Sequence, residues 1–196
     1  MVEKGRAFIQ DSPSIIGIVE ILKPLQLRAH PDWSGATSTL WLDFQEGRDP
    51  MWNGPAFDGA KIALLCGANV LTYLRDDKDG IPFRGMWDLA GGGREGDESP
   101  IACALRETRE EFGLIVDPER VVWERLHAPL DAGGLGSYFF VARIEQEAVD
   151  AIQFGEEGQQ WSLKPINAFL KEANAVPHLK SRLAAYMLGM AMQAAR

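Results

Sequence analysis

The chain has 196 residues, 46% hydrophobic and 24% charged, an ordinary globular composition that excludes disordered and collagen-like classes. Twenty Lys and Arg against 28 Asp and Glu give a formal net charge of -8, so we expect no duplex nucleic acid as a partner. Cys66 and Cys103 lie far apart without CxxC spacing, and no signal peptide or membrane-spanning run is evident. These features predict a cytoplasmic location and no membrane partner.

The first 58 residues read as a separate N-terminal extension. Strands are predicted over residues 15–22 and 38–44, which are rich in β-branched and other apolar residues. The pattern changes near residues 50–59, where turn-forming Pro and Gly residues gather. We therefore expect a β-rich extension over residues 1–58, packed on the core or in a dimer contact, and a second domain over residues 59–196.

The second domain alternates short apolar runs with two helices. The helix before Gly113 begins at Ser99, a good N-cap, followed by Pro100 in the first turn. Residues 179–195 form a helix that is apolar on nearly all sides, which predicts burial in the core or at a subunit contact. The runs predicted as strands are 61–66, 70–75, 87–90, 121–126 and 138–144. Together these elements predict an α/β fold with a mixed sheet and helices on its faces.

The residues with distinctive chemistry lie in the first of these helices. Glu107 and Glu111 are four residues apart, and like charges at that spacing oppose helix formation by about 0.2–0.5 kcal/mol. Arg106 can reach Glu110, but nothing at helical spacing neutralises the pair. Carboxylate oxygens are ligands that Mg²⁺ prefers, so the cluster predicts a magnesium site shared with a pyrophosphate. The alternative is a solvated charged face.

Three glycines precede the helix. Gly91, Gly92 and Gly93 can adopt backbone angles closed to other residues, which lets a phosphate or metal approach the main chain. An ordinary flexible turn is the alternative, since glycine marks turns in all proteins.

The periodicity of the helix predicts which side of it is buried. Ile101, Leu105, Thr108 and Phe112 fall along one side, and we expect that side to face the sheet.

This segment resembles the Nudix box, Gx5Ex7REUxEExGU, in which U is a bulky aliphatic residue. The matching positions are Gly92, Glu98, Arg106, Glu107, Glu110, Glu111, Gly113 and Leu114. Thr108 departs at the first U, and Ala90 stands where many members have Pro. The chain is identified by this resemblance as a member of the Nudix hydrolase (MutT-like) family, which implies a Nudix α/β/α sandwich with a mixed β-sheet.

The resemblance also implies roles for the box residues. Glu107 and Glu111 would be the principal metal ligands, and Glu110 would contribute to the metal and to catalysis, directly or through water. The Gly91 carbonyl would be a further ligand, and Gly91, Gly92 and Gly93 would form the binding turn. Glu98 and Arg106 would brace the turn against the helix. The metal implied is Mg²⁺, with Mn²⁺ as a substitute.

The general base is left open. Family members often draw a further glutamate from a loop after the box, and residues 154–161 resemble such a loop. Glu157 is the first candidate and Glu156 the second. A solvated acidic turn is the alternative, because the box alone could supply the base.

The function implied is a Mg²⁺-dependent Nudix hydrolase that cleaves the pyrophosphate linkage of a nucleoside diphosphate derivative or a (d)NTP with a metal-activated water. The partner is therefore a small-molecule nucleotide, and a homodimer is consistent with the extension. ADP-ribose-like compounds and (d)NTPs both stay open as substrates. Two rivals are a non-catalytic Nudix-fold module that senses a nucleotide and an inactive dimer scaffold.

Overall fold

A mixed β-sheet forms the centre of the computed structural model, which describes residues 52–195. The strands follow the path β3-β2-β1-β6-β5, with β4 paired to β1 and β7 paired to β2. β1 and β6 are parallel, and the other neighbours are antiparallel. The strands are β1 (Phe57–Cys66), β2 (Asn69–Leu74), β3 (Trp87–Asp88), β4 (Ala90–Gly93), β5 (Val121–His127), β6 (Gly136–Arg143) and β7 (Gln160–Pro165).

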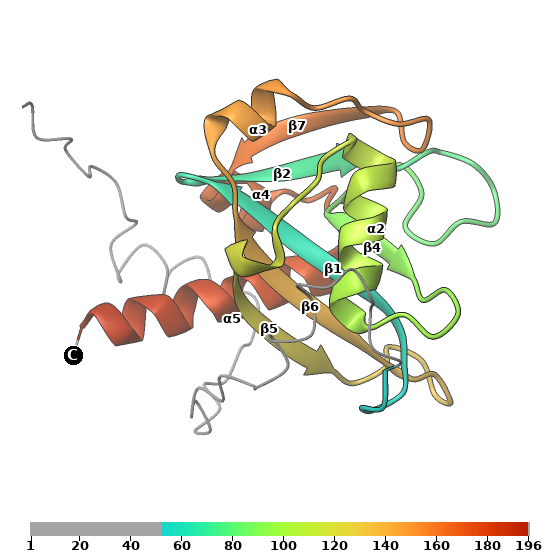
Figure 1. The fold of residues 1–196 in the computed structure, drawn as a ribbon. Coiled ribbons are helices and arrows are strands. Elements are labelled where there is room, and N and C mark those ends of the chain that lie inside the picture. Colours follow the sequence, from blue (N-terminus) through green and yellow to red (C-terminus); the bar gives the residue numbers. More distant parts are fainter. Residues whose placement is uncertain (1–51, 196) are drawn as a thin grey trace, which may run out of the picture.

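Helices cover both faces of this sheet. In Figure 1, α2 lies across one face, and α5 crosses behind the other face with α4 beside it. The predicted α/β/α sandwich with a mixed sheet is therefore confirmed. The helical segments are α2 (Pro100–Phe112), η4 (Pro118–Arg120), α3 (Gln146–Asp150), α4 (Ile166–Lys171) and α5 (Pro177–Ala194).

Alternate residues of the central strand serve two separate cores. Ile62 and Leu64 of β1 pack in the core under α2, whereas Ala63 and Leu65 pack in the core under α5. Successive side chains of a strand point to opposite faces, so a strand covered on both sides is apolar throughout. The continuous apolar run of β1, predicted as a strand, follows from this double burial.

The β1 strand also divides the sheet. Its C-terminal end pairs with β2 through Leu65 and Val70, while its N-terminal part pairs with β4 from Gly59 to Ile62. The predicted strand at residues 87–90 is accordingly split at Leu89 into β3, which joins β2, and β4, which joins β1. The chain changes neighbours immediately before the glycine turn, and this places the turn beside the centre of the sheet.

Helix α2 has the predicted ends. The Ser99 side chain accepts a hydrogen bond from Ala102 N, and Gly113 (φ 67°) ends the helix by donating its N–H to Arg109 O. The predicted buried seam is partly wrong, because Ile101 and Leu105 are only half-buried. The residues of α2 that are buried are Pro100, Cys103, Ala104, Thr108, Glu111 and Phe112. Cys103 and Ala104 are small, so the helix can approach the sheet closely, and Glu111 lies on the same buried face two turns after Ala104.

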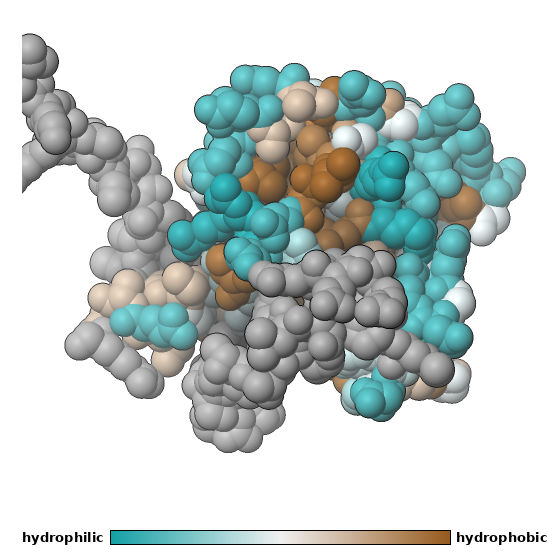
Figure 2. Space-filling model, viewed as in Figure 1, coloured by the Kyte–Doolittle hydropathy of each residue, from teal (hydrophilic) through white to brown (hydrophobic). Residues whose placement is uncertain are grey.

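Helix α5 is buried along its first half, where Leu179 and Leu183 enter the core, and exposed near its end, where Met192 is 48% exposed. Within residues 52–195, no helix is long and apolar enough to cross a membrane. Figure 2 shows a mostly hydrophilic face, with hydrophobic side chains gathered beside α2 near the segment that leads out of it. Four elements were not predicted from the sequence: η4, α3, α4 and β7.

The predicted strands at 15–22 and 38–44 lie outside the described residues. The division of the chain at residues 58 and 59 stays a prediction, as does the placement of the extension on the core or in a dimer contact.

Candidate active site

The glycine turn fits closely against β1 and α2. Gly91 has φ 127°, and a Cβ at this position would collide with the Ala60 carbonyl oxygen. A Cβ on Gly92 would lie 2.5 Å from the carboxylate atoms of Glu107. Glycine is therefore required at both positions, once by backbone conformation and once by the approach of a side chain. The turn brings main-chain atoms of β4 against a carboxylate of α2.

Arg106 ties the turn to the helix. Its Nε and Nη2 donate to the Glu98 carboxylate at 3.1 and 2.9 Å, and Nη2 also donates to Gly93 O at 2.9 Å. The Arg106 bonds lower the pKa of Glu98 although its partial burial opposes them. A two-pronged Arg–carboxylate contact restricts orientation more than a single bond does. The structure thus brings together the two residues expected to brace the turn.

The same arginine reaches two of the helix glutamates. Arg106 Nη1 donates to Glu107 at 2.8 Å and to Glu110 at 3.0 Å. The expectation that nothing neutralises Glu107 is therefore wrong, because the neighbouring guanidinium bends back onto it. Burial still raises the pKa of Glu107, and the Arg106 contacts act in the opposite direction. The Glu110 side chain is 59% exposed, so it faces solvent beside the site.

Glu111 is the most enclosed of the three glutamates, at 2% exposure. Gly91 N donates to its carboxylate at 3.1 Å, which links the helix to the turn. Burial raises the pKa of Glu111 to about 8, while the charge of Lys61 and a hydrogen bond from Tyr73 lower it. Among the residues that the structure describes, no Lys, Arg or His forms an ion pair with Glu111.

A second polar group lies next to Glu111 and was not predicted. Asp88 of β3 is 3% exposed, and its carboxylate accepts from Lys61 Nζ at 3.0 Å and Arg75 Nη1 at 2.7 Å. Tyr73 lies 3.4 Å from the same oxygen through its hydroxyl. The sequence did contain a signal, since a lysine within an apolar strand run and an aspartate between Trp87 and Leu89 are both unusual in a core. This group connects β1, β2 and β3 beneath the site.

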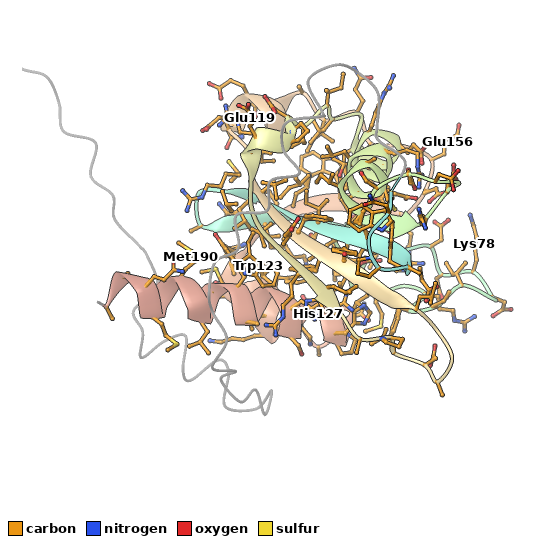
Figure 3. The ribbon with its side chains drawn as sticks, turned by 60° about the horizontal axis from the view of Figure 1, so that its bottom comes forward. Lys78, Glu119, Trp123, His127, Glu156 and Met190 are labelled. Carbon is orange, nitrogen blue, oxygen red and sulfur yellow. The ribbon has the colours of Figure 1, made fainter. Side chains whose placement is uncertain are left out.

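The loop that holds the base candidates is fastened to the end of α2. Gly155 N donates to Glu111 O at 2.8 Å, and Gln159 N donates to Leu74 O at 2.8 Å. Glu156 and Glu157 lie between these anchors and are exposed, and neither carries an ion pair within residues 52–195. Figure 3 shows Glu156 on the side of the molecule where α2 lies. The loop that carries both glutamates therefore lies at the Glu110 and Glu111 end of the helix.

The donor set suits a hard divalent cation. Within residues 52–195, no group of three or more His, Cys, Asp or Glu side chains is arranged to hold a metal ion, since Glu110 is turned toward Arg106. Glu111 is a buried carboxyl group without a contacting cation in the same residues, so its ionised form becomes favourable only when a cation lies beside it. The oxygens of Glu107 and Glu111 beside the glycine turn therefore fit Mg²⁺ or Mn²⁺ by their chemistry.

Comparison with known proteins gives one family. A family model described as NUDIX domain matches residues 59–185. Among solved structures, a MutT protein from Methanosarcina mazei Go1 has 17% identity and a TM-score of 0.53, covering 71% of this chain and 96% of that one. The NUDIX domain of Shewanella oneidensis NrtR complexed with ADP ribose has 21% identity and a TM-score of 0.51, covering 71% and 92%.

A third structure contains a metal. The bifunctional NMN adenylyltransferase/ADP ribose pyrophosphatase from Francisella tularensis, complexed with AMP and a Mn ion, has 15% identity and a TM-score of 0.52. The alignment covers 67% of this chain and 42% of that one, so this chain matches less than half of the bifunctional enzyme. At these identities the likeness shows the fold. The family model, by contrast, matches residues 59–185 of 196, so this chain belongs to the Nudix hydrolase family and is a pyrophosphohydrolase by class.

Proposed function

We propose that this protein hydrolyses the pyrophosphate linkage of a nucleoside diphosphate derivative or a (d)NTP with Mg²⁺, which Mn²⁺ can replace. The observation that carries the proposal is the Glu111 carboxylate, 2% exposed, bonded to Gly91 N, and without a contacting cation in the part of the chain that the structure describes. A glutamate with a purely structural role is expected to form an ion pair or to face solvent. Glu111 is buried and forms no ion pair within residues 52–195.

Each box residue has a definite task in this proposal. Glu107 and Glu111 hold the metal, with Glu110 joining directly or through water and the Gly91 carbonyl as a further ligand. Arg106 and Glu98 keep Glu107 and the turn of Gly91, Gly92 and Gly93 in position. Residues that orient ligands in this way commonly change metal affinity or activity by about 10- to 100-fold.

The bound metal would neutralise charge that develops on the phosphate oxygens and make a bound water a stronger nucleophile. Glu157, with Glu156 as the second candidate, would accept the proton of the attacking water. Support for this role comes from the backbone bond between Gly155 and Glu111, which fastens the loop to the metal-binding end of α2. The exposed carboxylates have no competing ion pair within residues 52–195.

The experiment is product release from a panel of ADP-ribose, dinucleotides, NDP-sugars and (d)NTPs, each with and without Mg²⁺. Glu111→Gln is the blank, since it removes the charge and keeps the volume. Mg²⁺-dependent release from one class by the wild-type protein alone supports the proposal. Nucleotide binding without release across the panel would favour the sensing module instead, and release that survives Glu111→Gln would overturn the role of Glu111.

A homodimer, an inactive dimer scaffold and a cytoplasmic location stay predictions. Size-exclusion chromatography with light scattering, on the full chain and on a chain that starts at residue 52, tests whether the extension carries a dimer contact.

A further inference from the structure

Lys61 of β1 lies close to Glu111 but does not bind it. Lys61 and Gly91 are register partners on β1 and β4, and Gly91 N is the donor to the Glu111 carboxylate. A Cβ at Gly91 would lie 2.9 Å from Lys61 Cδ, so the lysine side chain passes directly beside Gly91. Within residues 52–195, Lys61 forms an ion pair with Asp88 and none with Glu111. An ammonium group therefore lies near a candidate metal ligand without contacting it.

Asp88 holds this ammonium in place. Lys61 Nζ donates to the Asp88 carboxylate at 3.0 Å and to Leu89 O at 3.0 Å. The two acceptors belong to consecutive residues at the split between β3 and β4, so they fix the ammonium on the β3 side of Gly91. Asp88 is 3% exposed, and a buried ion pair keeps its geometry because separation leaves a buried charge without a partner. Asp88 thus determines which carboxylate Lys61 binds.

The groups that contact Glu111 are neutral. Gly91 N donates to its carboxylate at 3.1 Å, and the Tyr73 hydroxyl forms a hydrogen bond with it. The same hydroxyl accepts from Arg75 Nη1 at 3.2 Å and lies 3.4 Å from the Asp88 carboxylate. Neutral donors orient a carboxylate and leave its negative charge available, whereas an ammonium in contact with it cancels much of that charge. Glu111 is therefore oriented without being neutralised.

A cation in contact with Glu111 would compete with a metal ion. Burial raises the pKa of Glu111, and the nearby charge of Lys61 is the largest of the effects that lower it. If Asp88 carried no charge, Lys61 would lose its carboxylate partner and could turn to Glu111 instead. A divalent cation would then have to displace the ammonium before it could bind, and its affinity would fall.

We propose that Asp88 is a positioning residue for the metal site, which binds the Lys61 ammonium and so keeps Glu111 free for a divalent cation. This inference rests on the proposed function and adds to it a residue outside the box. The alternative is that Asp88 and Lys61 only join β1 and β3. The two accounts differ in sign, because only the positioning role makes Lys61 unfavourable for metal binding once Asp88 is neutral.

The test is a double-mutant cycle on the full chain, in which free Mn²⁺ is counted by electron paramagnetic resonance. Asp88→Asn should weaken Mn²⁺ binding by about 10- to 100-fold, the usual range for residues that orient metal ligands. Adding Lys61→Met to Asp88→Asn removes the competing ammonium and should return the affinity to near the wild-type value. Unchanged affinity in Asp88→Asn, or a double variant that binds as weakly as Asp88→Asn, would overturn the proposal.

Lys61→Met alone keeps the test decisive if Asp88→Asn fails to fold. In this variant Asp88 retains Arg75 Nη1 as a partner at 2.7 Å, and Mn²⁺ should bind at least as tightly as in the wild-type protein. Thermal unfolding in EDTA shows whether each variant is folded. A folded Lys61→Met protein with Mn²⁺ affinity tenfold weaker than wild type would assign both residues a structural role and overturn the proposal.

Glu172→Gln is the matched control. It removes the carboxylate from another partly buried lysine pair, that of Lys164 on β7, which lies outside the box. Its Mn²⁺ affinity should equal that of the wild-type protein. A loss equal to that of Asp88→Asn would show that the effect is not specific to Asp88 and would overturn the proposal.

The binding measurement does not depend on turnover, so the two proposals can fail separately. The full pattern of the cycle together with no hydrolysis of any nucleotide would reject the proposed function and leave Asp88 as the positioning residue of a metal site. Hydrolysis that requires Glu111, together with equal Mn²⁺ affinity in the wild-type protein and Asp88→Asn, would keep the proposed function and overturn this inference.

Discussion

The two sides of the sheet present opposite charges. On the α2 side, Glu111 is buried and Glu107 is half-buried beside the glycine turn, and Glu111 has no contacting cation within residues 52–195. On the α5 side, Arg182 is buried without an ion pair to a carboxylate of residues 52–195, and the buried Nε2 atom of His127 has no hydrogen-bond partner there. We propose that a divalent cation completes the α2 side.

A chain with a net charge of -8 needs a local cation to bind the anionic nucleotide that we propose as its substrate. A phosphate approaching acidic residues is repelled unless a cation lies between them. Lys61 and Arg75 both form ion pairs with the buried Asp88. The charges of the site are therefore arranged locally, and overall charge is a poor guide to its ligand.

The largest effect on activity is expected from a change at Glu111 on the α2 side. Glu111→Gln should lower kcat by about 10²–10³-fold, since it removes a charged metal ligand. The metal-free melting temperature should stay level or rise, because the amide needs no cation. Steady-state kinetics and thermal unfolding in EDTA measure both. A melting temperature that falls by many degrees would show that Glu111 stabilises the fold and would contradict its assignment as a metal ligand.

Glu157, the first candidate for the general base, should have the next largest effect on activity. Glu157→Gln should lower kcat by about 10²-fold if its carboxylate accepts the proton. Glu119→Gln is the matched control, because Glu119 is an exposed glutamate in η4. A change of less than a few fold in Glu157→Gln would transfer the role to Glu156 or to the box, which Glu156→Gln then distinguishes.

The contact between Arg106 and Glu98 should have a smaller effect on activity. Arg106→Lys should lower kcat/KM by about 10- to 100-fold, since an ammonium cannot reproduce the two parallel bonds to Glu98. Arg109→Lys, on the exposed face of the same helix, should leave it unchanged. The apparent Mg²⁺ constant should weaken in Arg106→Lys alone. Equal kinetics in the two variants would show that the contact with Glu98 does not position the site.

The smallest effect is expected at His127 and His178 on the α5 side, as a change in how stability depends on pH. Burial lowers the pKa values of His127 and His178 to about 3 and about 4, so the folded protein binds fewer protons than the unfolded chain below pH 6.5. The free energy of unfolding that depends on the neutral rings is fully present above pH 6.5 and is lost as the pH falls toward 4. After screening by solvent, each should cost about 1 kcal/mol between pH 7 and pH 5. Urea unfolding of His127→Gln should show a shallower loss than the wild-type protein, and an identical loss would contradict this account.

The sequence predicted one side of the molecule far better than the other. The ends of α2 depend on Ser99 and Gly113, which act within one turn of the helix, and the glutamates follow from helical spacing. Thr108 could depart from the box pattern because its hydroxyl bonds to Ala104 O at 2.7 Å, one turn back. These are local effects, which a pattern in the sequence can express.

The other side depends on contacts between distant residues. Strand β7 is recognisable only through its pairing with β2. The contact of Arg182 with Ser137, beside His127, depends on the β5–β6 register and on how α5 lies against β6. An arginine within an apolar helix was a signal of burial, but nothing in the sequence states that Ser137 and His127 face it. Tertiary packing decides such contacts, so sequence reasoning did not identify them.

The central claim is that buried box carboxylates hold a divalent cation, and electron paramagnetic resonance of Mn²⁺ tests it most directly. Free Mn²⁺ is counted during titration of the wild-type protein, Glu111→Gln and the control Glu119→Gln. The account predicts a site in the wild-type and control proteins, with affinity at least tenfold weaker in Glu111→Gln, and Mg²⁺ competing for it. Equal Mn²⁺ affinity in all three proteins would contradict the account.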